Sequence, residues 1–87
     1  MADIPADLEV KIAEIIVERL FLTITPADIG VDESLTIKYG VDSVRLFDMV
    51  VGMEDDFDIS FEDNELIIEN FDSIAKIATS VRAKAED

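Results

Sequence analysis

The chain has 87 residues, of which 49% are hydrophobic, and its formal net charge is −14 at pH 7. This length predicts a single domain over residues 1–87 with a modest core, and the charge argues against nucleic acid as a partner, because phosphate binding needs a basic surface. Cysteine and histidine are both absent, which excludes disulfides, thiolate metal sites and the Ser–His and Cys–His pairs of nucleophilic catalysis.

The N-terminal stretch MADIPADLEV has no basic segment and no long apolar run, so we expect no signal peptide. No part of the chain approaches the length of a membrane-spanning helix. The sequence therefore predicts a cytoplasmic monomer without membrane insertion. Its negative charge favours basic protein partners, because opposite charge accelerates their encounter.

The first predicted helix runs from about Pro5 to Phe21, and Pro5 suits its first turn because proline lacks an N–H that would be unpaired there. Apolar residues recur in this segment at the spacing of an amphipathic helix. They are Leu8, Ile12, Ile15, Ile16 and Leu20.

The next stretch, LTITPADIGVDESLTIKYG, is predicted to be mostly loop. The pair Thr25-Pro26 is typical of a helix start, which favours a short helical turn. A loop of this length needs anchors, so we expect Leu35, Ile37 and Tyr39 to point inward.

A second helix is predicted from Asp42 or Ser43 to about Phe57. One face of it forms the core stripe, made of Leu46, Met49, Val50, Met53 and Phe57. The opposite face mixes apolar and acidic side chains: Val44, Asp48, Val51 and Asp55, with Phe47 and Glu54 at its edge.

A short third helix is predicted around Glu62 to Leu66, and the last helix begins near Asp72-Ser73. The last helix carries a stripe of Ile74, Ile77, Ala78 and Val81. No segment alternates as a strand would over a useful length. The pattern predicts a small all-α bundle of four helices.

Ten acidic residues and no Lys or Arg lie between Leu46 and Ala75. They are Asp48, Glu54, Asp55, Asp56, Asp58, Glu62, Asp63, Glu65, Glu69 and Asp72. The segment DDFDISFEDNE does not fit a calcium-binding EF-hand loop, because Phe61 and Ile67 fall at its Gly and Glu positions. We therefore predict no dedicated metal site, only weak and delocalised binding of divalent cations.

Asp42 and Ser43 are both residues that commonly cap a helix. One cap suffices, so the second residue needs its own explanation. If Asp42 is the cap, Ser43 becomes the first helical residue and its hydroxyl is exposed. A phosphate attached to that hydroxyl would face the positive end of the helix, which suits phosphorylation or a phosphodiester-linked cofactor.

The stretch GVDSVRLFDMVVGMEDDFDISF closely resembles the acyl carrier protein family. That family has the pattern Gly-x-Asp-Ser-Leu at the head of an acidic second helix. The order of elements is also similar: an amphipathic helix, a long loop, the Asp-Ser helix, a short third helix and a last helix after ENFDSI. The resemblance extends from about Leu8 to Val81.

The resemblance implies a carrier protein and not an enzyme. A phosphopantetheinyl transferase would attach 4′-phosphopantetheine from coenzyme A to Ser43, beside the matching Asp42. The arm would carry acyl groups as thioesters for fatty acid, lipid or polyketide-type synthesis. Partners would be acyl-transferring or acyl-activating enzymes with basic docking patches. The residues implied in docking are Val44, Arg45, Phe47, Asp48, Val51, Glu54 and Asp55.

Several residues depart from the family's commonest pattern. Val44 replaces a leucine, Arg45 replaces an acidic residue, and Glu62 stands where proline is frequent. Arg45 either pairs with Asp48 one turn on or changes the choice of partner through like-charge exclusion, which we favour. Gly52 indicates either close helix packing or space for an acyl chain lined by methionines.

Two other functions remain open from the sequence. An aminoacyl, D-alanyl or peptidyl carrier would have the same arm on Ser43. A helical interaction module of a different class would bind a basic partner without any modification, and Ser43→Ala would then be harmless. A stand-alone enzyme is disfavoured, because the chain has no His, no Cys and no phosphate-binding loop.

Overall fold

Four α-helices and three single 3-10 turns make up the regular structure of residues 6–86, the part of the chain that the computed structural model describes. The α-helices are α1 (Leu8–Arg19), α2 (Leu35–Tyr39), α3 (Ser43–Phe57) and α4 (Ile74–Glu86). The 3-10 turns are η1 (Pro26–Asp28), η2 (Asp63–Glu65) and η3 (Ile68–Asn70). Over these residues the predicted small all-α fold with four helices is confirmed, and none of the helices is long and apolar enough to cross a membrane.

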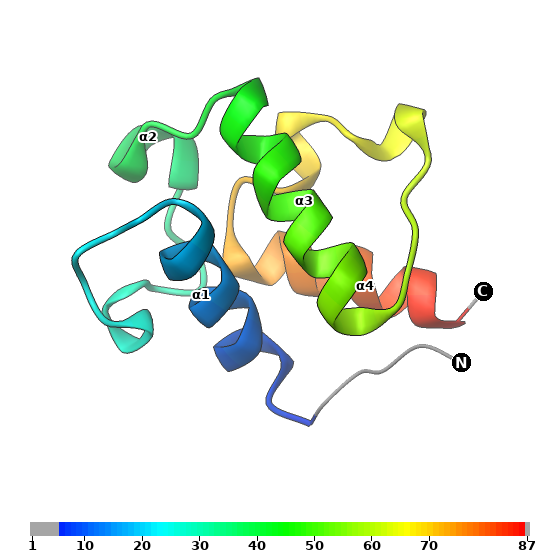
Figure 1. The fold of residues 1–87 in the computed structure, drawn as a ribbon, viewed down its shortest axis with the longest axis horizontal. Coiled ribbons are helices and arrows are strands. Elements are labelled where there is room, and N and C mark those ends of the chain that lie inside the picture. The colour runs from blue at the N-terminus through cyan, green and yellow to red at the C-terminus, as the bar shows by residue number, and fades with distance from the viewer. Residues whose placement is uncertain (1–5, 87) are drawn as a thin grey trace.

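Figure 1 shows α1, α3 and α4 arranged around one centre. The buried apolar side chains of these three helices form the core there. All five residues of the stripe predicted for α3 are buried, as are the four predicted for the last helix. Helix α1 packs against both α3 and α4. Within the core, Phe61 and Phe71 make an edge-to-face contact, with their ring centroids 5.3 Å apart.

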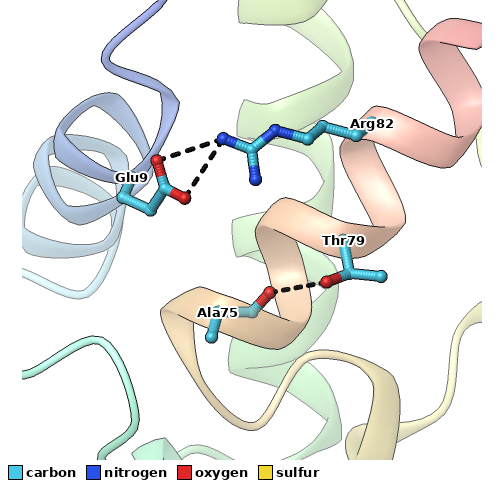
Figure 2. Close-up of polar contacts among 4 residues, drawn as sticks. All are labelled: Glu9, Ala75, Thr79 and Arg82. Carbon is cyan, nitrogen blue, oxygen red and sulfur yellow. Dashed lines mark hydrogen bonds and ion pairs between the residues drawn. The ribbon is translucent and has the colours of Figure 1, made fainter.

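An ion pair joins the outer sides of α1 and α4. Figure 2 shows the carboxylate of Glu9 directed at the guanidinium of Arg82, whose Nη2 donates to both carboxylate oxygens at 3.1 and 3.2 Å. The pKa of Glu9 is lowered, first by a hydrogen bond from its own backbone and then by Arg82. In the same view the Thr79 hydroxyl donates to the carbonyl of Ala75, one turn earlier in α4.

Helix α1 ends in a Schellman motif that has a phenylalanine at the usual glycine position. The N–H of Leu22 donates to the carbonyl of Val17 at 3.0 Å, and that of Phe21 donates to Glu18 at 3.4 Å. Phe21 has a φ of 54°, in the left-handed region that a bulky side chain rarely adopts. The helix therefore ends earlier than predicted, and its predicted start at Pro5 lies outside the described residues.

The predicted loop between the first two long helices contains an additional short helix, α2. Its N-cap is Ser34, whose hydroxyl accepts from the N–H of Ile37, and it ends at Gly40 with a φ of 65°. Leu35 and Tyr39 pack inward as predicted. The prediction for Ile37 is wrong: its side chain is 87% exposed. In a helix, residues four apart share a face, and the residue midway between them points away.

The third helix predicted around Glu62 to Leu66 is a single 3-10 turn, η2, followed by a second turn, η3. Glu62 and Glu65 close η2 reciprocally as a capping box. Such a short segment gains too few backbone hydrogen bonds to form a stable α-helix. The short turn predicted after Thr25-Pro26 is present as η1, and Asp28 completes a capping box with Thr25.

Candidate functional site

Asp42 is the residue that caps α3. Its carboxylate accepts a hydrogen bond from the N–H of Arg45 at 3.0 Å, and its backbone carbonyl accepts from Leu46 at 2.8 Å. The backbone of Asp42 is extended, as an N-cap requires. Ser43 is therefore the first helical residue, and its side chain is exposed.

The start of α3 can accommodate a phosphate on the Ser43 hydroxyl. The N–H groups of Ser43 and Val44 lie in the first turn, where a helix offers no internal acceptor. The positive end of a fifteen-residue helix adds to their attraction for an anion. Since the Asp42 carboxylate already accepts from Arg45, the cap and the free hydroxyl belong to different residues.

A second Asp-Ser pair provides an internal comparison. Asp72-Ser73 lies immediately before α4, and Asp42-Ser43 lies at the start of α3, of which Ser43 is the first residue. At the second pair the serine is the cap: the Ser73 hydroxyl accepts from the N–H of Lys76 at 3.2 Å, and Ser73 is only 6% exposed. The same dipeptide thus gives one serine that is buried and bonded and another that is exposed.

The chain that leads into Ser43 is held by contacts with the start of α4. The carboxylate of Asp72 accepts from the backbone N–H of Thr36 and from the Ser34 hydroxyl, both at 2.9 Å. The carbonyl of Asp72 accepts from the N–H of Leu35 at 2.7 Å. These bonds lower the pKa of Asp72, chiefly through the backbone N–H of Thr36. Helix α2 is thereby fixed one short loop before α3.

The outer face of α3 presents an apolar strip. Val44, Phe47 and Val51 follow one another at intervals of three and four residues, and all three are exposed. Asp55 is exposed one turn beyond Val51. This arrangement agrees with the mixed face predicted from the sequence, and it suits a transient protein contact with an apolar centre and a polar rim.

Some charged residues of this face form ion pairs or hydrogen bonds within the protein, and others do not. Asp48 lies 3.5 Å from Nη1 of Arg19 on α1, so its partner is Arg19 and the pairing with Arg45 considered above does not form. Glu54 is half-buried, and its carboxylate accepts from the N–H of Phe61 at 2.8 Å. Arg45 is exposed, with no ion-pair partner among residues 6–86.

Gly52 lies where α3 passes close to α1. A Cβ atom at this position would stand 2.9 Å from Cγ2 of Ile15 and 3.0 Å from Nε of Arg19. The glycine is therefore explained by close helix packing. Met49 and Met53, considered as the lining of an acyl cavity, are both fully buried in the core.

The acidic segment is not organised as a metal centre. Within the described part of the chain, no three carboxylates are grouped so that they could hold a metal ion. Glu65 pairs instead with Nζ of Lys84 at 2.6 Å, which lowers the pKa of Glu65.

Sequence reasoning missed three residues that shape this site. In the sequence, Arg19 and Phe21 are ordinary residues near the predicted end of the first helix, and Asp72 marks only the predicted start of the last helix. Arg19 and Asp72 contact residues 29 and 36 positions away in sequence. Phe21 adopts a left-handed backbone where glycine is usual. A single sequence carries no local signal for any of these features.

The comparison with protein families decides between a carrier and an unrelated helical module. The family model described as "Phosphopantetheine attachment site" matches residues 10–81. The chain belongs to this family. Phosphopantetheine carriers are not catalysts: they hold 4′-phosphopantetheine covalently and interact with a modifying transferase and with synthase enzymes. A search of curated proteins finds no match to this chain.

Proposed function

We propose that Ser43 is the attachment serine of an acyl carrier protein that acts in the cytoplasm. One observation carries the assignment of the residue: Asp42 caps α3, which leaves the exposed Ser43 hydroxyl at the positive end of the helix. Ser73, the serine of the second Asp-Ser pair, is buried and already bonded.

Attachment is a phosphoryl transfer from coenzyme A. The Ser43 oxygen forms a bond to the phosphorus nearer the pantetheine, and the bond from that phosphorus to the bridging oxygen breaks. Adenosine 3′,5′-bisphosphate leaves, and the hydroxyl proton passes to a base of the phosphopantetheinyl transferase. The attached group supplies a terminal thiol that carries acyl chains as thioesters. The contribution of this chain is to position the hydroxyl and to recognise enzymes.

Partner enzymes dock on the outer face of α3 in this proposal. The strip of Val44, Phe47 and Val51 supplies the apolar contact. Asp55, which is exposed and has no ion pair with any described residue, supplies a negative charge for a basic partner residue. Asp48 and Glu54, which the resemblance also implies in docking, contribute less because each is already engaged within the protein.

Arg45 makes this a specialised carrier in our proposal. It places a positive charge beside Ser43, where a basic docking residue of a housekeeping fatty-acid enzyme would approach. Like charges at this position exclude such an enzyme. Equal kcat/KM of housekeeping acyl-transferring enzymes for this carrier and for a standard fatty-acid carrier would contradict the specialisation.

An aminoacyl, D-alanyl or peptidyl cargo is the second candidate, because it needs the same arm on the same serine. Acyl-transferring and amino-acid-activating enzymes, each given the modified carrier, separate the two by which thioester forms. The strong acidity of the chain favours the acyl cargo.

The deciding experiment is intact-mass spectrometry after incubation with coenzyme A and a broad-specificity phosphopantetheinyl transferase. The wild type should gain one phosphopantetheine, Ser43→Ala should gain none, and the matched control Ser73→Ala should gain one. If the wild type is not modified while a known carrier is, Ser43 is not an attachment site. Modification of Ser43→Ala would assign the arm to another residue.

A further inference from the structure

A shallow hollow of about 210 Å³ lies between the end of α1 and the first turns of α3. It is lined by Arg19, Leu20, Phe21, Arg45 and Asp48. The hollow thus adjoins the helix start that carries Ser43, and it lies beside the apolar strip on α3.

The charge of this hollow is opposite to that of the protein. Two arginines and one aspartate are among its lining residues, and the carboxylate of Asp48 already pairs with Arg19 at 3.5 Å. Arg45 has no ion-pair partner in residues 6–86. The lining is therefore net positive on a chain whose net charge is −14, and an incoming carboxylate would meet the unengaged Arg45.

The apolar wall of the hollow is held in an unfavourable conformation. Phe21 adopts a φ of 54° and exposes 88% of its side chain. Glycine would satisfy the same helix end without strain. Neither backbone geometry nor burial accounts for a phenylalanine here, whereas contact with another molecule would.

We propose that this hollow is a docking subsite for an acidic side chain of a partner enzyme, with Arg45 binding the carboxylate and Phe21 packing against an adjacent apolar residue. The subsite deepens the proposed function and rests on it, because the partner is an enzyme that loads or unloads the carrier. It selects partners whose docking surface presents Asp or Glu opposite Arg45, in contrast to the basic contact expected at Asp55.

The first test uses a defined fragment and needs no knowledge of the partner. Unmodified ¹⁵N-labelled protein is titrated with 4-methylpentanoate, which joins a carboxylate to a branched apolar tail. Amide shifts should be confined to residues 19–22 and 45–48 and should saturate with a Kd of about 5–50 mM, as a fragment of this size allows. Isoamylamine, the cationic counterpart, should give no such pattern.

Three variants complete the titration. Arg45→Gln and Phe21→Gly should each weaken fragment binding at least several-fold. Lys11→Gln removes the same single charge from an exposed site on α1 and should bind like the wild type. If the shifts are absent, are spread over the chain, or persist in Arg45→Gln, the hollow is not a carboxylate subsite.

A second test measures the effect of the subsite on the KM of a partner enzyme. The modified carrier is given to a housekeeping acyl-transferring enzyme and to a form of it in which the basic docking residue facing position 45 has been changed to Glu. The Glu form should show a severalfold lower KM for the wild-type carrier, and Arg45→Glu should reverse that preference. Unchanged KM values in both comparisons would overturn the proposal. The fragment titration does not depend on Ser43, so loss of the attachment reaction and loss of the subsite are distinguishable.

Discussion

The carboxylate of Asp72 binds the backbone N–H of Thr36 at a separation of 36 residues, with an N–O distance of 2.9 Å. Through this bond Asp72, two residues before α4, pairs an N–H in the first turn of α2, the short helix that Ser34 caps and that leads to Ser43. The hydroxyl of Ser34 shares the same carboxylate. The orientation of the loop before α3 therefore depends on one charged side chain near the opposite end of the chain.

We predict that Asp72→Ala lowers the free energy of unfolding by about 1–3 kcal/mol, as expected for removal of hydrogen bonds to a charged group. Urea denaturation at neutral pH measures the loss. A variant as stable as the wild type would show that α2 is held mainly by the burial of Leu35.

The same bond predicts a dependence on pH. The pKa of Asp72 is lower in the folded protein than its ordinary value of 3.8. Its stabilisation is therefore complete above the ordinary pKa and is lost as pH falls through the folded value. The difference in the free energy of unfolding between the wild type and Asp72→Asn, measured by urea denaturation, should decrease as the pH is lowered below about 5. If this difference does not change with pH, the negative charge of Asp72 does not contribute to stability.

Phe21→Gly should stabilise the protein by about 1 kcal/mol, because glycine adopts the left-handed conformation without the penalty of a Cβ atom. Little burial is lost, since the ring is mostly exposed. Phe21→Ala is the matched control: it removes the ring but keeps the Cβ, so it should stabilise less. Thermal melts rank the stability of the wild type and the two variants. A glycine variant less stable than the wild type would contradict this account of the helix end.

Asp42→Ala should cost about 0.5–2 kcal/mol of stability through loss of the helix cap. Ser43→Ala should change stability by less than about 0.5 kcal/mol, as for a surface residue outside the core. Denaturation curves of the two variants therefore separate the cap from the free hydroxyl. The reverse order of stabilities would identify Ser43 as the cap and weaken its assignment as the attachment site.

Gly52→Ala should destabilise the protein by about 1–2 kcal/mol, because overpacking exceeds the roughly 1 kcal/mol that alanine gains in helix propensity. The contact is with Cγ2 of Ile15, close to the α1 backbone, and it cannot easily move away. Ile15→Leu removes that methyl group while keeping the side-chain volume. The double variant should recover part of the loss. If the stability changes of Gly52→Ala and Ile15→Leu, measured by urea denaturation, simply add in the double variant, the two side chains are not in contact.

Millimolar Mg²⁺ or Ca²⁺ should raise the melting temperature gradually and without a sharp end point. The acidic segment has no grouped metal ligands within the described residues, so cations act by reducing repulsion among its carboxylates. Sodium chloride at equal ionic strength should have a smaller effect. A saturable transition at one equivalent of metal would instead indicate a discrete site.

Local features of this chain were predictable from sequence, and features that depend on distant contacts were not. The apolar stripe of α3 follows from periodicity. Residue preferences within one turn identify Asp42 and Ser43 as two possible caps, and the structure shows that Asp42 is the one that caps. The outward orientation of Ile37 requires knowledge that its segment is helical, which depends on Asp72. The two Asp-Ser pairs show the limit most clearly, because only tertiary packing buries Ser73 and leaves Ser43 exposed.

The bonds that join the loop before Ser43 to the start of α4 also have a consequence for the timing of maturation. The N–H of Ala75 donates to the carbonyl of Val31, and Asp72 holds Thr36. Asp72 and Ala75 leave the ribosome roughly thirty residues after Ser43, at a synthesis rate of about 5–20 residues per second. A transferase that recognises the folded site would therefore find its substrate only after the last helix has emerged, so a nascent chain still lacking α4 would be spared modification.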